Sequence, residues 1–269
     1  MLGSGVSSAI RSLKRAVLDA VFGRESRCVM CSDAADSSKL CDECLSRIPM
    51  ACGCRCSKCG TVIRTQSLPE NDVVCKGCAS THHYFASARS PAVYEGVARS
   101  MVADLKYRAR IEFAEAMANL MALECFKTGI AYECDLAVAV PMHPVKEGYR
   151  GYNQANLLCG ELARLLGMEC GLSVLMRREQ VDTQTHHDRA GRRENTLRAF
   201  VCWEPERVRN RKVLLVDDVL TSGATADGCA RALLRAGAAA VHVVTFAVSV
   251  ADGRDWRGDT VCECAWLVI

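Results

Sequence analysis

The stretch Lys212-Val-Leu-Leu-Val-Asp217-Asp218-Val-Leu-Thr-Ser-Gly-Ala-Thr225 decides the fold of this 269-residue chain. Its apolar run is typical of a strand that is buried on both faces. A helical pattern follows over about residues 224–236, and Gly237 separates it from a second apolar run over 240–246. Strand, helix and strand in this order predict a βαβ unit and a parallel sheet, and therefore an α/β fold.

The loop inside this stretch carries the chemistry. Hydroxyl groups at Thr221, Ser222 and Thr225 stand beside Gly223 where the helix opens. Backbone N–H groups at a helix start and neighbouring hydroxyls together favour a bound monoester phosphate. Two adjacent acids, Asp217 and Asp218, precede the loop, and their presence is explained if they bind diol hydroxyls or a magnesium ion. Two solvated acids before a capped helix are the alternative interpretation.

Upstream of this stretch, the sequence alternates between helical and strand patterns. Residues 96–125 carry apolar side chains at helical spacing and predict two helices that break near Tyr107. Residues 136–140 form a short apolar run that ends at Pro141 and predicts another buried strand. Residues 153–166 again have a helical pattern. These elements extend the same α/β domain, which we place over residues 90–269.

Ten of the 18 cysteines lie between residues 28 and 78. Eight of them form four CxxC pairs, and two pairs complete the four-sulfur shell that zinc prefers. The predicted ligands of two structural zinc ions are Cys28, Cys31, Cys41, Cys44, Cys56, Cys59, Cys75 and Cys78. Disulfides, a redox-active pair and an iron–sulfur cluster are the alternatives. Cys52 and Cys54 stand outside the pattern and have no assigned role.

This cysteine-rich zinc-ribbon module is expected over residues 26–82. So short a segment buries too little apolar surface to fold without a metal. We expect His82 and His83, which lead out of it, to be surface residues. Residues 1–25 predict an amphipathic helix that docks on the module or, alternatively, lies on a membrane surface.

Composition sets further bounds on the function. The formal net charge of +3 is only weakly basic and does not by itself require a nucleic-acid partner. The chain shows no export signal and no membrane span, so we expect a cytoplasmic protein. Half of the residues are hydrophobic, which excludes wholesale disorder.

The motifs together resemble one family. The stretch VLLVDDVLTSGAT resembles the phosphoribosyl diphosphate (PRPP) motif of type I phosphoribosyltransferases. The rest of the chain is similar to the ComF family, in which a cysteine-rich zinc module precedes such a domain. The matching segments beyond the cysteine pairs are Tyr94-Glu-Gly96, Leu105-Lys-Tyr107, Val140-Pro-Met-His-Pro144, Arg150-Gly-Tyr-Asn-Gln-Ala155, Thr183-Gln184, Arg193-Glu-Asn195 and Ala199-Phe200.

The resemblance implies roles for individual residues. Asp217 and Asp218 would be the catalytic pair that holds the ribose hydroxyls, with Mg2+ accompanying PRPP. The expected PRPP-binding residues are Thr221, Ser222, Gly223, Ala224, Thr225, Lys146, Arg150 and Lys106. Lys146 and Arg150 lie in the predicted loop 141–150 that would meet the diphosphate. Residues 177–193 resemble the flexible loop that closes over the site in this fold, although a merely solvated loop is the alternative.

The family resemblance implies a role in natural transformation and the uptake of single-stranded DNA. One hypothesis is a Mg2+-dependent phosphoribosyltransferase with an unidentified acceptor. A second is a competence factor without enzymatic activity that handles DNA, and a third is a protein adaptor. The arginines that could line a DNA-binding face are Arg108, Arg110, Arg150, Arg177, Arg178, Arg189, Arg192 and Arg193. The low aromatic content of 6% argues against base stacking as the main mechanism.

Overall fold

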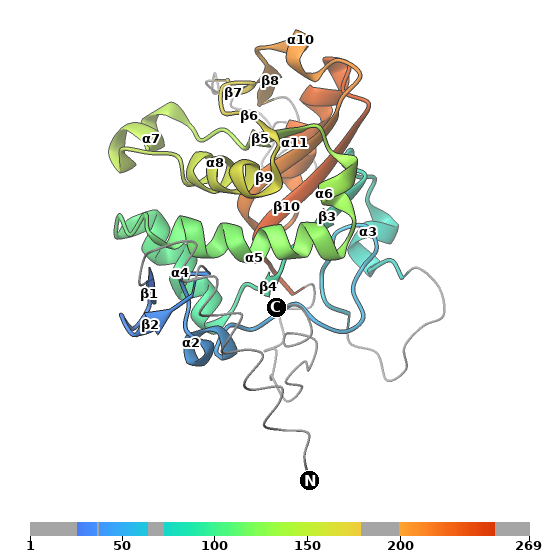
Figure 1. Cartoon of the computed structure of the whole chain (residues 1–269). Helices are drawn as coiled ribbons and strands as arrows, with labels where there is room; N and C mark the ends of the chain where they lie inside the picture. Colours follow the sequence, from blue (N-terminus) through green and yellow to red (C-terminus); the bar gives the residue numbers. More distant parts are fainter. Residues whose placement is uncertain (1–25, 37, 64–72, 179–198, 251–269) are drawn as a thin grey trace. The chain divides into compact units, whose positions relative to one another are not determined.

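The computed structural model describes residues 26–36, 38–63, 73–178 and 199–250 (Figure 1). The chain divides into two compact units, Met1–Arg47 and Ile48–Ile269. The helix predicted over residues 1–25 and most of the predicted loop 177–193 lie outside the described residues. The domain boundaries drawn from the sequence stay predictions, but the two cysteine clusters fall in different compact units.

The first unit contains little regular structure. Strand β1 (Ser26–Arg27) pairs antiparallel with β2 (Ala34–Ala35), and helix α2 (Asp42–Ser46) follows. Cys28 and Cys44 are among its buried residues. The turns that carry the cysteines therefore take the place of a large apolar core.

The second unit is built on a parallel sheet, which confirms the predicted α/β fold. Its strands are β3 (Ser87–Arg89), β4 (Ala92–Val93), β5 (Leu136–Ala139), β6 (Glu169–Gly171), β9 (Lys212–Leu220) and β10 (Ala240–Val248). The order is β3-β10-β9-β5-β6, with β4 also paired to β10, and every pairing is parallel. Residues 213–216 of β9 are fully buried, as their apolar run predicts.

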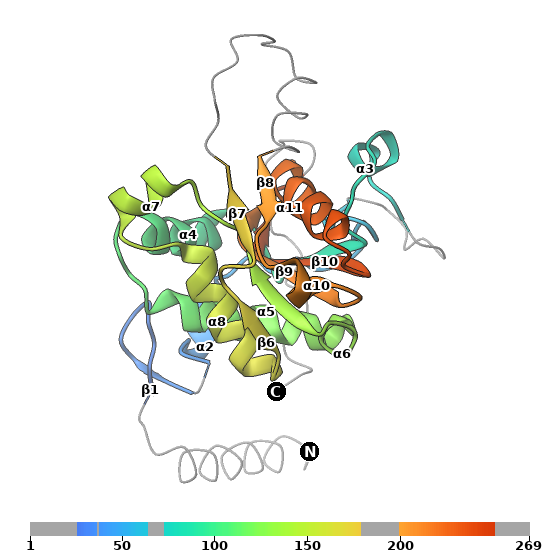
Figure 2. The ribbon, with the colours of Figure 1, turned by 90° about the horizontal axis from the view of Figure 1, so that it is seen from above.

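Helices cover both faces of the sheet (Figure 2). Helices α5 (Phe113–Lys127) and α8 (Gln154–Leu166) pack on one face, and α11 (Ala224–Arg235) packs on the other. The remaining elements are α3 (Lys76–Ser80), α4 (Gly96–Tyr107), α6 (Ile130–Glu133), α7 (Pro144–Arg150), α10 (Pro205–Val208) and the antiparallel pair β7 (Leu175–Arg177) and β8 (Phe200–Cys202). The predicted break near Tyr107 is confirmed, since α4 ends there.

The segment 141–150 is not the plain loop that the sequence predicts. Its last seven residues form α7, because Pro144 occupies a first-turn position and His143 caps the helix. The cap is a hydrogen bond of 3.3 Å from the backbone N–H of Val145 to His143 Nδ1. Proline at a helix start loses no intrahelical hydrogen bond, so its presence favours this helix.

The connections leave the two central strands in opposite directions. From β9 the chain passes through α11 to β10, and from β5 it passes through α8 to β6. Because β9 and β5 are neighbours, the sheet changes its winding direction between them. In open α/β sheets, ligands bind outside the carboxyl ends of strands at such a switch point.

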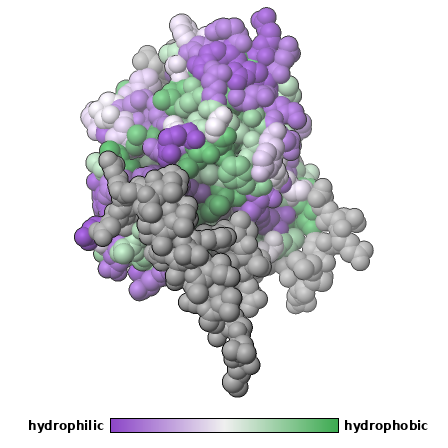
Figure 3. Space-filling model, in the orientation of Figure 1, coloured by the Kyte–Doolittle hydropathy of each residue, from purple (hydrophilic) through white to green (hydrophobic). Residues whose placement is uncertain are grey.

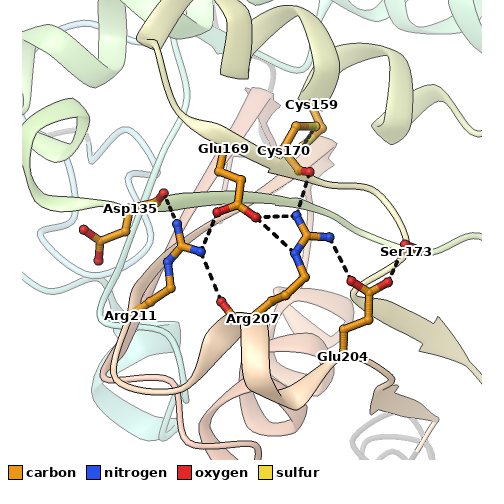
Figure 4. A network of polar contacts seen from close by, with 8 residues as sticks. All are labelled: Asp135, Cys159, Glu169, Cys170, Ser173, Glu204, Arg207 and Arg211. Atoms are coloured by element: carbon orange, nitrogen blue, oxygen red, sulfur yellow. Dashed lines mark hydrogen bonds and ion pairs between the residues drawn. The ribbon is translucent and has the colours of Figure 1, made fainter.

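The amino ends of the strands are fastened by a network of ion pairs (Figure 4). Arg207 and Arg211 each approach the Glu169 carboxylate to 2.6 Å, and Arg207 also binds Glu204 at 2.8 Å. Hydrogen bonds from both arginines lower the pKa of Glu169. The surface around α10 is accordingly hydrophilic (Figure 3). The ion pairs at this end of the sheet stabilise the fold, whereas Asp217 and Asp218 lie at the opposite end of the strands.

Asn153 joins α8 to the end of β5. Its Nδ2 donates to the carbonyl oxygen of Val140 at 3.0 Å, and its Oδ1 accepts the N–H of Ala155 at 3.0 Å. We expect Asn153→Ala to lower the free energy of unfolding by about 2–3 kcal/mol, since it removes a helix cap and leaves a buried carbonyl unpaired. Urea unfolding of the metal-loaded protein, followed by circular dichroism, measures this.

The variant Asn153→Ser is the matched control. Serine still caps a helix but is too short to reach Val140, so about 1 kcal/mol of the loss should return. A change below about 0.5 kcal/mol in Asn153→Ala would contradict this role.

Candidate functional site

The eight predicted ligand cysteines gather into two clusters. Cys28, Cys31, Cys41 and Cys44 form the first, and Cys56, Cys59, Cys75 and Cys78 form the second. Within each cluster all four sulfur atoms lie within 4.8 Å of one another. Among the described residues, Cys52 and Cys54 belong to neither cluster.

The surroundings of the sulfur atoms fit a bound metal ion. The backbone N–H groups of Cys59 and Cys75 point at Cys56 Sγ from 3.5 and 3.3 Å. Backbone hydrogen bonds outweigh burial at two of the thiols and lower the pKa of Cys28 to about 6 and that of Cys56 to about 7. At Cys31, Cys44, Cys59 and Cys78 the thiol pKa is raised instead. The convergence of four sulfur atoms in each cluster is what could hold a metal ion such as zinc in a closed, structural shell.

The second cluster is tied to the parallel sheet. The N–H of Ala88 in β3 donates to the carbonyl oxygen of Lys58 at 2.7 Å. Gly60 has a φ of +71°, and a Cβ there would lie only 2.6 Å from the carbonyl oxygen of Ala88. Arg55 forms an ion pair with the buried Glu124 of α5, with 2.6 Å between Arg55 Nη1 and Glu124 Oε1. Only glycine allows so close an approach of the cluster to the edge strand.

The acid pair lies at the carboxyl end of β9. In the register with β10, Asp217 stands opposite Thr245. The Asp217 carboxylate accepts the backbone N–H of Asp218 through its Oδ1 at 2.9 Å. Asp218 is buried, and its Oδ2 lies 2.7 Å from Lys106 Nζ near the end of α4. The structure thus brings together two predicted site residues that are far apart in the sequence.

The charges of this group depend on one another. Burial opposes the charge on Lys106, but the attraction of Asp218 and Asp217 outweighs it and raises the pKa of Lys106. Burial, helped by the neighbouring Asp218 charge, raises the pKa of Asp217 well above its ordinary value. A site with one carboxylate more than it has cations favours an approaching hydroxyl group or cation.

The predicted phosphate loop follows directly. Thr221 and Ser222 are exposed, and Gly223 has a φ of +75°, which favours glycine. Ala224 begins α11, and Thr225 lies in its first turn. The N-cap residue Gly223 makes no side-chain cap, and the N–H of Ala224 points at Ser222 Oγ from 3.5 Å. The first N–H groups of a helix lack intrahelical partners, so this end is suited to an anion.

Lys146 and Arg150 are both on α7, after the neighbouring strand β5. Lys146 is exposed. The Arg150 guanidinium binds the side-chain oxygen of Gln154 and lies 5.3 Å from the ring centre of Tyr107. The contacts of Arg150 are thus with α8 and α4, and its predicted role toward the diphosphate stays a prediction.

Two buried residues beside the loop escaped the sequence analysis. His83 is 8% exposed, so its prediction as a surface residue is wrong, whereas His82 is exposed as predicted. The hydrogen-bond partner of His83 is Asp227, which is buried in the first turn of α11. An acid in a first helical turn is a common sequence feature, and nothing in the sequence pairs it with a histidine more than 140 residues away.

Comparisons with known proteins agree with this geometry. Residues 154–264 match the family "Phosphoribosyl transferase domain". "DNA utilization protein YhgH" of Escherichia coli (strain K12) is 32% identical over 219 residues, which cover 74% of this chain and 93% of that protein. The chain belongs to the ComF family. "Competence protein F" of Haemophilus influenzae is 32% identical over 107 residues, or 39% of this chain and 47% of that one.

Family membership accounts for the two parts of the molecule. A phosphoribosyltransferase-like parallel-sheet domain follows cysteine tetrads in this ComF-family chain. Among solved structures, the chain is similar to a glutamine PRPP amidotransferase from B. subtilis, with 22% identity and a TM-score of 0.33. The match covers 49% of this chain and only 26% of that enzyme. In the described residues, no helix has both the length and the apolar character needed to cross a bilayer.

The clusters predict the metal content. We expect two metal ions per chain, with Cys28→Ser and Cys56→Ser each losing one, because a missing thiolate opens the four-sulfur shell. Native mass spectrometry gives both the number of ions and their identity, and it separates zinc from an iron–sulfur cluster by mass. The variant Cys52→Ser is the control and should keep both ions. A single ion in the wild type, or a loss in Cys52→Ser, would contradict this assignment.

Proposed function

We propose that this protein binds PRPP with Mg2+ outside the carboxyl ends of β9 and β5, and that it acts on DNA during uptake. The observation that carries the PRPP site is the acid pair Asp217–Asp218, directly followed by the loop that opens α11 at the switch point of the sheet. A ribose 5-phosphate has a phosphate at one end and a diol at the other, and this order of groups matches it.

The residues divide the ligand between them. Asp217 and Asp218 would accept hydrogen bonds from the two ribose hydroxyls, which suits carboxylates that are crowded and short of positive charge. Thr221, Ser222 and the first N–H groups of α11 would hold the 5-phosphate. Bound Mg2+ would neutralise charge on the diphosphate. Lys106 holds the Asp218 carboxylate in place through their 2.7 Å ion pair.

The DNA role is supported by the relatives. Proteins named for DNA utilization and for competence align with most or part of this chain. A second observation favours a DNA-handling surface beside the PRPP site. Tyr107 and Tyr149 are 76% and 90% exposed, and Arg108, Lys146 and Arg150 lie on the same two helix segments. The chain as a whole is poor in aromatic residues, but two exposed rings gathered among cations are typical of surfaces that stack single-stranded bases.

The PRPP site is tested by calorimetric titration of PRPP with Mg2+ into metal-loaded protein. We expect the wild type to bind, and Asp217→Asn and Asp218→Asn each to weaken binding about tenfold or more, because each loses a charged hydrogen-bond acceptor. Asp135→Asn changes an aspartate at the amino ends of the strands and should bind like the wild type. A folded wild type that does not bind PRPP would overturn the proposed site.

The DNA surface is tested by fluorescence anisotropy with a labelled single-stranded oligonucleotide. We expect Tyr107→Ala/Tyr149→Ala to weaken binding at least tenfold, since each stacked base contributes about 1–3 kcal/mol. The control Tyr132→Ala removes an equally exposed ring, 79% accessible, from α6 and should leave affinity unchanged. Equal losses in both variants, or no binding by the wild type, would count against a stacking surface on α4 and α7.

A further inference from the structure

A buried histidine–aspartate pair lies under the loop that opens α11. His83 Nδ1 is 2.8 Å from Asp227 Oδ2, and the two side chains are 6% and 1% exposed. The backbone N–H of Tyr84 donates to the other carboxylate oxygen of Asp227 at 2.9 Å. Both oxygens of one helix residue are therefore bound by the segment that leaves the second cysteine cluster.

The same histidine packs directly against the loop. A Cβ placed on Gly223 would lie 3.5 Å from His83 Cε1 and 3.7 Å from Phe85 Cε1. In addition, the N–H of Asp227 donates to the carbonyl oxygen of Gly223 at 2.8 Å. His83 thus lies beside Gly223 with its ring, and it binds the side chain of Asp227, whose N–H makes the first i→i−4 hydrogen bond of α11. The position of Gly223 determines where the N–H groups that follow it point.

The His83 ring also packs on a buried aromatic ring. Its ring stacks on Phe85 with a centroid distance of 4.7 Å and an interplanar angle of 23°. Phe85 is fully buried, and Lys58 Nζ lies 5.8 Å from the centre of its ring. Lys58 stands between two cysteines of the second cluster and accepts the hydrogen bond from Ala88. The histidine is therefore held between the loop and a region organised by that cluster.

We propose that His83 is a positioning residue for the phosphate loop. Together with Asp227 it holds Gly223 and the first turn of α11 in the conformation that receives the 5-phosphate. Buried, hydrogen-bonded partners on both sides restrict the loop before any ligand arrives, which reduces the entropy lost on binding. The inference rests on the proposed function for its ligand, whereas the loop contact itself is independent of it.

The first test measures the loop without ligand. Hydrogen–deuterium exchange is followed in peptides that cover residues 217–230 of the metal-loaded full chain. We expect His83→Ala to speed exchange at the first turn of α11 about tenfold, while His82→Ala, the exposed neighbour, exchanges like the wild type. His83→Asn should restore protection, because its side-chain amide can still donate to Asp227. Metal content and circular dichroism show that each variant is folded.

The second test is PRPP titration with the same variants. We expect at least tenfold weaker binding by His83→Ala and near wild-type binding by His83→Asn. If the wild type fails to bind PRPP, the proposed function is overturned, and the exchange data still decide the inference. Unchanged exchange in folded His83→Ala overturns the inference. Should His83→Ala fail to fold, Asp227→Ala replaces it, and wild-type protection of the loop in that variant overturns the inference equally.

Discussion

Strand β9 pairs along its whole length with β10 but only along its first half with β5, and the site depends on this difference. Its register with β10 runs from Lys212 to Leu220, but its register with β5 ends at Val216. Up to that point the strand is buried on both sides, and each buried valine or leucine contributes about 1.5–3 kcal/mol of burial free energy. Beyond it, Asp217 and Asp218 have a neighbouring strand on one side only. The end of the strand therefore places both carboxylates at the switch point of the sheet.

Charge at that point is balanced by a helix that lies more than a hundred residues earlier in the chain. Lys106 lies in the last turn of α4 and pairs with Asp218, while burial and the neighbouring Asp218 charge raise the pKa of Asp217. An isolated buried charge is unfavourable. The Lys106–Asp218 ion pair beside an Asp217 of raised pKa is therefore more stable than two unpaired carboxylates would be. The remaining imbalance favours a ligand that brings hydroxyl groups or positive charge.

The two cysteine clusters have the same ligands but different settings. The first lies in a small unit that has little apolar core, so its metal would supply much of that unit's folding free energy. The second is hydrogen-bonded to β3 and ion-paired to α5 through Arg55 and Glu124. It is structurally part of the phosphoribosyltransferase-like unit, and its outgoing segment supplies the histidine beneath the loop.

Local patterns determined much of this protein. The run from Val213 to Val216, the CxxC spacing and the glycine of the loop are short-range signals, and β9, both cysteine clusters and the start of α11 follow from them. The break at Tyr107 was also readable from helical spacing.

Only the tertiary structure decided which distant residues meet. It paired Lys106 with Asp218, placed Arg150 over Tyr107 and buried His83 against Asp227. Spacing along the chain records periodicity within one element, whereas such contacts depend on how strands and helices pack across more than a hundred residues. That is why the acid pair and its loop could be predicted, and the residues that balance and support them could not.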